Sequence, residues 1–128
     1  MNKVNQNEIL ERFENPQQKE DYTINITVPE FTCLCPKTGQ PDFATLYIKY
    51  IPKDFCLELK SLKLYIVSFR NVGAFHESVA NQICNDLSKT INPQLLTLKA
   101  QFNVRGGIHT SIKVQYRNKE WKDSNHLL

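Results

Sequence analysis

The chain has 128 residues, 41% of them hydrophobic, which is typical of one domain with one core. Its 16 Lys and Arg residues against 13 Asp and Glu residues leave a formal net charge of +3, too little to indicate a nucleic-acid partner. No apolar run approaches the roughly 20 residues of a membrane-spanning helix, so a membrane protein of that kind is excluded.

The ends of the chain are expected to lie outside the core. Residues 1–21 are polar and predict an N-terminal arm, residues 22–117 a single domain, and residues 118–128 a C-terminal tail. The chain contains four cysteines: Cys33, Cys35, Cys56 and Cys84. They include no Cys-x-x-Cys pair, and the polar start does not look like a secretory signal. We therefore expect reduced thiols and a cytoplasmic location.

Two strands are expected in the first half of the domain. Residues 22–28 alternate apolar and polar side chains, the period of a strand with one buried face, and Pro29 is expected to end that strand. Residues 43–51 are rich in aromatic and β-branched side chains, which favours a second strand ending at Pro52.

The pattern then changes to the spacing of helices. The first predicted helix carries apolar residues three and four positions apart: Leu59, Leu62, Ile66 and Phe69. The second repeats an apolar residue every fourth position and is expected to end at Pro93: Phe75, Val79, Ile83 and Leu87.

The last part of the domain predicts a hairpin. Residues 95–104 and 108–116 read as two strands around the turn Arg105-Gly106-Gly107. The element order is therefore ββααββ. It predicts an α+β fold, with a four-stranded antiparallel sheet and both helices on one face.

One stretch combines a nucleophile with an acid. It reads Cys35-Pro36-Lys37-Thr38-Gly39-Gln40-Pro41-Asp42. Its prolines and glycine favour a stiff turn before a strand. A thiolate is a strong nucleophile, and a carboxylic acid can protonate the group that the thiolate attacks. Cys35 and Asp42 are thus candidate catalytic residues, although a cysteine taken alone is more often a small packing residue.

Three further motifs follow along the chain. They read Glu58-Leu59-Lys60-Ser61-Leu62-Lys63-Leu64-Tyr65, then Phe69-Arg70-Asn71 with Phe75-His76-Glu77, and finally Arg105-Gly106-Gly107-Ile108. In this order and spacing the chain resembles the QueF family, the NADPH-dependent 7-cyano-7-deazaguanine reductases, in its short single-domain form. The resemblance runs from about residue 31 to residue 108. Leu59 departs from the family pattern, which has a serine there.

The resemblance implies the tunnelling fold, in which subunits join edge to edge and their sheets close a barrel. It implies a homo-oligomer, a decamer of two stacked pentamers. The implied reaction, a step of queuosine biosynthesis for tRNA modification, is a four-electron reduction of the nitrile of 7-cyano-7-deazaguanine by two NADPH. No metal, direct nucleic-acid partner or membrane is implied.

The same resemblance implies residue roles. Cys35 would form a thioimidate with the nitrile carbon, and Asp42 would supply the proton. Substrate contacts are implied for Leu57, Glu58, Leu59, His76 and Glu77. Contacts with the cofactor phosphates are implied for Lys60, Lys63 and Arg105.

The residues alone leave other interpretations open. Glu77 could simply place favourable charge at a helix start, and His76 could be an ordinary structural histidine. A zinc hydrolase of the same fold, similar to GTP cyclohydrolase, could use Cys33, Cys35 and His76 as ligands, although no further histidine is well placed. A third interpretation is a non-catalytic, ring-forming binding protein.

Overall fold

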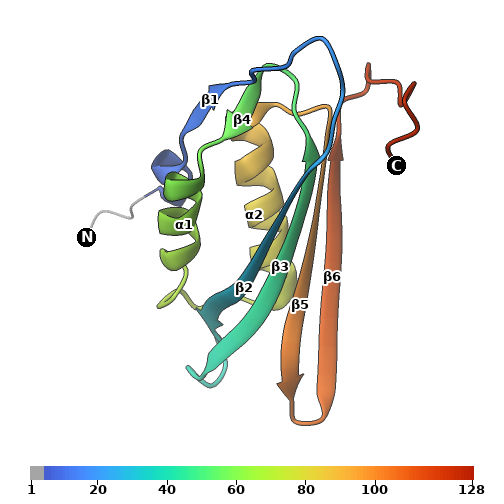
Figure 1. Ribbon diagram of the computed structural model, residues 1–128. Coiled ribbons are helices and arrows are strands. Elements are labelled where there is room, and N and C mark those ends of the chain that lie inside the picture. The colour runs from blue at the N-terminus through green and yellow to red at the C-terminus, as the bar shows by residue number, and fades with distance from the viewer. Residues whose placement is uncertain (1–4) are drawn as a thin grey trace.

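A computed structural model describes residues 5–128 of the chain. Its main sheet is antiparallel in the order β2-β3-β5-β6, and both helices cover one face of it (Figure 1). The strands of this sheet are β2 (Ile24–Leu34), β3 (Pro41–Ile51), β5 (Leu95–Arg105) and β6 (Ile108–Arg117), and the helices are α1 (Leu59–Val67) and α2 (His76–Ile91). The predicted ββααββ order and α+β class are confirmed. Within residues 5–128, no helix is long and apolar enough to cross a membrane.

Alternation along the strands builds the core. On β3, Ala44, Leu46 and Ile48 are buried beneath the helices, whereas Phe43 and Tyr47 are exposed on the opposite face. One core cluster joins the helix-covered face of the sheet to the buried stripes of both helices. The opposite face of the sheet carries no helix (Figure 1).

The helices follow the predicted stripes except at Leu59 and at Phe75, which precedes α2 and is 53% exposed. α2 buries Val79, Ile83 and Leu87, and it ends where Asn92 adopts a left-handed conformation with φ of 44°. Leu59, expected on the buried face of α1, is 62% exposed. The buried residues of α1 are Ser61, Leu62, Tyr65 and Ile66. Leu59, in the first turn, is not among them.

Pro29 does not end the first long strand, contrary to expectation. β2 continues to Leu34, and its register with β3 shifts between Val28 and Phe31. Pro29 therefore lies in a bulge of an edge strand, where a missing N–H breaks no ladder hydrogen bond.

The segments expected outside the domain pack against it. A 3-10 helix (Gln6–Ile9) leads to Leu10, which is 8% exposed in the core, and then to β1 (Arg12–Glu14), which pairs with the short strand β4 (Phe55–Leu57). Trp121 in the tail packs with Ile51 and Leu95. Single apolar residues in polar segments have no periodicity, so the sequence pattern missed both contacts. Residues 1–4 of the expected arm lie outside the described residues.

Candidate active site

A cleft of about 350 Å³ opens at the lower end of the sheet in Figure 1. There β2 and β5 end, and β3 and β6 begin. Residues predicted from three different motifs line it together: Cys35, Asp42, His76, Glu77 and Arg105. The fold thus joins the Cys35–Asp42 stretch, the start of α2 and the β5–β6 hairpin in one site.

Backbone hydrogen bonds fix the turn that carries Cys35. The Cys35 N–H donates to the Gln40 carbonyl at 2.8 Å, and the Gly39 N–H donates to the Cys35 carbonyl at 2.8 Å. Gly39 has φ of 72°, a conformation that glycine adopts at little cost. Leu34 also accepts from the Ala74 N–H at 3.0 Å, which holds the segment before α2 beside the turn.

Cys35 is partly exposed and activated by its own turn. The Thr38 hydroxyl makes the largest contribution to lowering the pKa of the Cys35 thiol below its ordinary value, followed by the N–H groups of Thr38 and Lys37. These donors stabilise the thiolate more than the thiol. Cys35 is therefore suited to nucleophilic attack.

Cys33 has the opposite character, although it is two residues away. It is fully buried in the core, and burial, followed by the negative charge of Asp42, raises its pKa to about 11. Across residues 5–128, no three His, Cys, Asp or Glu side chains are grouped closely enough to hold a metal ion. The ligand set of Cys33, Cys35 and His76 considered for a zinc hydrolase is thus not assembled in the described part of the chain.

Asp42 is the most connected side chain of the cleft. It is 8% exposed, and its Oδ1 accepts a hydrogen bond from Arg105 Nη1 at 2.7 Å. Its Oδ2 lies 3.2 Å from His76 Nε2. The His76 ring is stacked face to face on Phe102, with centroids 3.6 Å apart and planes 4° apart. Sequence reasoning missed Phe102, which belongs to the apolar alternation of β5.

Glu77 lies in the first turn of α2 and is exposed in the cleft. Among residues 5–128, its carboxylate has no ion-pair partner, since both ion pairs found there involve Asp42. Its charge is also favourably placed near the helix N-terminus, as the structural interpretation expected. The carboxylate is therefore available to accept hydrogen bonds from a ligand.

The other predicted residues lie away from this cleft, in β4 and the start of α1. Leu57 is buried, and its N–H donates to Tyr50 Oη at 3.1 Å. The Glu58 carboxylate caps α1 by accepting from the N–H groups of Lys60 and Ser61. Arg105, predicted to act with Lys60 and Lys63, instead lines the Cys35 cleft.

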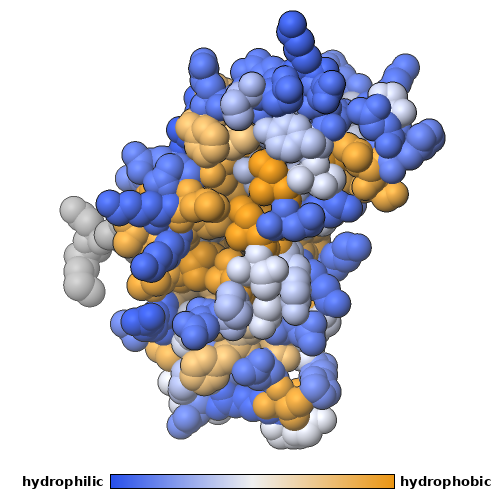
Figure 2. All heavy atoms as spheres, in the orientation of Figure 1, coloured by the Kyte–Doolittle hydropathy of each residue, from blue (hydrophilic) through white to orange (hydrophobic). Residues whose placement is uncertain are grey.

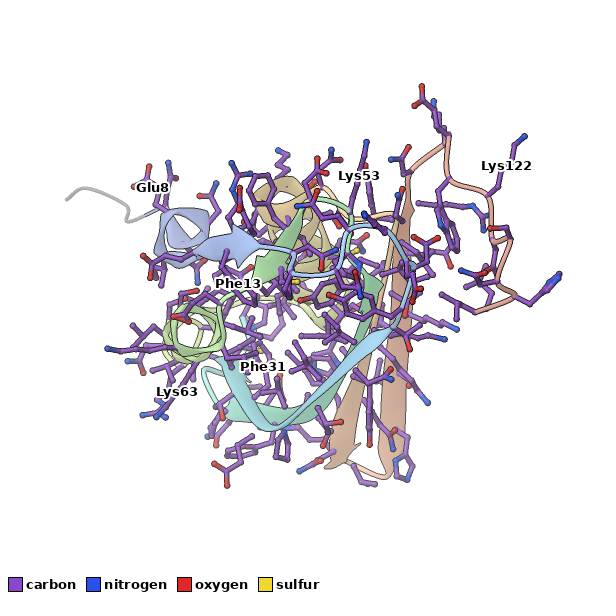
Figure 3. All side chains as sticks on the ribbon, turned by 45° about the horizontal axis from the view of Figure 1, so that its top comes forward. Glu8, Phe13, Phe31, Lys53, Lys63 and Lys122 are labelled. Carbon is purple, nitrogen blue, oxygen red and sulfur yellow. The ribbon has the colours of Figure 1, made fainter. Side chains whose placement is uncertain are left out.

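A second groove, of about 360 Å³, runs between β2 and α1. Figure 2 shows hydrophobic residues between these two elements, and Figure 3 shows Lys63 pointing outward from α1. Lys63 and Arg70 line this groove together with apolar residues, among them Leu62 and Ile66. The two cations could bind the phosphates of NADPH, and the apolar surface could hold a flat ring; the carboxylate of Glu30 also lines the groove. Sequence reasoning did not select Arg70.

Comparisons with known proteins identify the family of this chain. A family model described as QueF-like protein matches residues 41–121. A protein of Thioalkalivibrio sulfidiphilus is 59% identical, with 88% of each chain covered, and one of Nitrosococcus oceani is 59% identical, covering 90% of this chain and 89% of that one. Both are named NADPH-dependent 7-cyano-7-deazaguanine reductase.

A solved structure supports the fold. The crystal structure of the archaeosine synthase QueF-Like in the apo form matches with a TM-score of 0.70 at 18% identity, covering 76% of this chain and 95% of that chain. This match confirms the tunnelling fold of the single chain. The sequence, the model match and the relatives agree, and the chain belongs to the QueF family.

Proposed function

We propose that this chain is an oxidoreductase that uses NADPH to reduce the nitrile of 7-cyano-7-deazaguanine to the amine of 7-aminomethyl-7-deazaguanine, in queuosine biosynthesis. The relatives' names give the substrate and the cofactor. The observation that carries the proposal is one cleft lined by an activated thiol, a buried carboxyl group and an unpaired carboxylate: Cys35, Asp42 and Glu77.

The first step is the capture of the nitrile by Cys35. The thiolate forms a bond to the electrophilic carbon, and one C–N π bond breaks. Asp42 accepts the proton that the Cys35 thiol loses and passes it to the nitrogen, which leaves a thioimidate on Cys35 and a carboxylate at Asp42. Covalent capture divides a difficult reduction into easier steps.

Bound NADPH supplies hydride, and two equivalents account for the four electrons between a nitrile and a primary amine. Lys63 and Arg70, which line the groove, and Lys60, about one turn before Lys63 on α1, would hold its phosphates. Cys35 is released when the first reduced adduct collapses to an imine, so the thiol is regenerated in each cycle.

Glu77 is assigned to substrate recognition. A deazaguanine presents a ring N–H next to an exocyclic amine, and one carboxylate can accept from both. His76, held on Phe102, lies beside it and contacts the same ligand.

A second copy of the chain would complete the site. Leu57, Glu58 and Leu59 lie outside the Cys35 cleft of their own chain. β2 and β6 are long edge strands without a partner on one side in the described structure, and such edges favour pairing with another chain. We therefore propose a ring of subunits closing a barrel, stacked as a decamer, that shares each site between neighbours. The free thiols are consistent with a cytoplasmic enzyme.

The proposed function is tested by mixing the purified protein with 7-cyano-7-deazaguanine and NADPH and following cofactor absorbance. We expect two NADPH to be consumed for each amine formed. The same assay with Cys35→Ala should show no consumption above background. Consumption of one NADPH, or none, by the wild-type protein would contradict the proposal.

A further inference from the structure

Arg105 reaches Asp42 from another strand and holds it at two points. Its Nη1 donates to Asp42 Oδ1 at 2.7 Å and to the carbonyl of Pro41, the preceding residue, at 2.8 Å. One guanidinium nitrogen thus ties together the carboxyl group and the backbone that carries it. The Arg105 side chain is 46% exposed, whereas that of Asp42 is 9% exposed, so an exposed cation contacts a nearly buried carboxyl group, and both line the cleft.

The Asp42 carboxyl group is bounded on its other sides as well. His76 of α2 lies at Oδ2, at 3.2 Å. Cys33 of β2 is its cross-strand neighbour, and the Cys35 thiol is close enough for its charge to interact with that of Asp42. Arg105 is therefore the group facing Asp42 that carries a permanent positive charge.

We propose that Arg105 is a positioning residue for proton transfer: it orients Asp42 toward the Cys35 cleft and stabilises the charge that develops on Asp42 as its proton passes to the nitrile nitrogen. This inference rests on the proposed function and assigns Arg105 to thioimidate formation, before any hydride transfer. It differs from the role implied by family resemblance, in which Arg105 meets the cofactor phosphates with Lys60 and Lys63.

The two roles predict different results when no cofactor is present. A cofactor-binding arginine has no part in the reaction of Cys35 with the nitrile. A positioning arginine does, because the bond to sulfur forms as Asp42 loses its proton. A hydrogen bond to a charged group is worth about 1.5–3 kcal/mol, so its loss should slow adduct formation roughly ten- to a hundredfold.

The experiment measures thioimidate formation by intact-protein mass spectrometry, without NADPH, at one fixed pH. It compares wild type, Arg105→Gln, Arg105→Lys and a control on the exposed tail, Lys122→Gln. We expect the tenfold or greater slowing in Arg105→Gln, a partial recovery in Arg105→Lys and a wild-type rate in Lys122→Gln.

A second readout separates positioning from folding. Guanidinium ion at millimolar concentration should restore part of the rate in Arg105→Ala and leave wild type unchanged. Thermal unfolding of each variant should stay close to wild type, because Arg105 is half-exposed. A wild-type rate of adduct formation in Arg105→Gln would overturn the inference and leave the proposed function intact. Absence of any adduct in wild type would instead overturn the proposed function.

Discussion

The two ends of the main sheet use similar polar side chains in different ways. At the lower end in Figure 1, Cys35 and Glu77 face a cleft and keep hydrogen-bonding capacity for a ligand. At the upper end, Asn15 is 4% exposed and is fully engaged. Its Nδ2 donates to the Lys53 carbonyl at 2.9 Å, and its Oδ1 accepts from Tyr22 Oη.

The lower end carries the reactive groups, and the upper end stabilises the fold. The hydrogen bonds of Asn15 hold the N-terminal segment against the turn before β4. The polar groups of the Asn15 side chain find their partners within the chain. At the lower end, the Asp42 carboxyl group is held by Arg105 while the neighbouring thiol stays partly exposed. Changes at the lower end should therefore alter reaction rates, whereas changes at the upper end should alter stability.

The largest effect is expected at Cys35. Cys35→Ala should lower NADPH turnover by at least about a thousandfold, because it removes the nucleophile. Cys33→Ala, two residues away, should keep turnover and lose about 1–2 kcal/mol of unfolding free energy. Steady-state kinetics and denaturant unfolding of both variants measure this contrast. Equal loss of turnover in the two folded variants would contradict the assignment.

Asp42→Asn should lower turnover by roughly a hundred- to ten-thousandfold, the range for loss of a general acid. The amide is nearly isosteric but cannot donate a carboxylic proton. Alkylation of Cys35 by iodoacetamide, which needs no proton donor, should remain within a few-fold of wild type. If the alkylation rate falls as much as turnover does, Asp42 acts mainly by activating the Cys35 thiol and not by protonating the nitrile nitrogen.

Glu77→Gln should weaken binding of 7-cyano-7-deazaguanine by roughly ten- to a hundredfold, since a charge-assisted acceptor is lost. Calorimetric titration of a Cys35→Ala background avoids covalent reaction. NADPH affinity should change little, and Glu120→Gln on the exposed tail is the matched control. Unchanged substrate affinity would contradict the recognition role, and Glu77 would then only place favourable charge at the start of α2.

Asn15→Ala should lower the free energy of unfolding by about 1–3 kcal/mol, because the nearly buried Asn15 side chain loses its hydrogen bonds with the Lys53 carbonyl and the Tyr22 hydroxyl. The cofactor-free rate of adduct formation by folded protein should stay at the wild-type value. A large fall in that rate without loss of stability would show that the two ends are coupled.

The smallest effect is expected from Thr38→Val, which removes the hydroxyl that contributes most to the lowered pKa of Cys35. In wild type the thiolate forms at lower pH than in an ordinary cysteine, so alkylation begins at lower pH. In the variant, the pH midpoint of alkylation should move upward toward the ordinary value. A midpoint that moves downward or stays fixed would mean that another donor activates the thiol.

Local patterns predicted most of the fold. β3, β5 and α2 follow strong alternation or fourfold spacing, and their positions agree with expectation. The short strands β1 and β4 carry too few residues to show a period. The bulge at Pro29 also depends on β2 being an edge strand, which only the assembled sheet reveals.

Only part of the site could be predicted, because only some of its contacts join residues that are close in the sequence. Cys35 and Asp42 share one stiff turn, so their proximity followed from the sequence. The contact between Arg105 and Asp42 joins residues 63 positions apart, and no local pattern encodes it. The capping role of Glu58 was not evident from the sequence, because glutamate is not among the residues preferred at the N-cap position of a helix.

The most direct test of the account is the cofactor-free adduct itself. Wild-type protein is incubated with 7-cyano-7-deazaguanine alone, and its intact mass is measured beside Cys33→Ala and Cys35→Ala. We predict a gain of one substrate mass in wild type and in Cys33→Ala, and no gain in Cys35→Ala. A gain that persists in Cys35→Ala, or that disappears in a folded Cys33→Ala, would contradict the claim that the lower end of the sheet carries the nucleophile at Cys35.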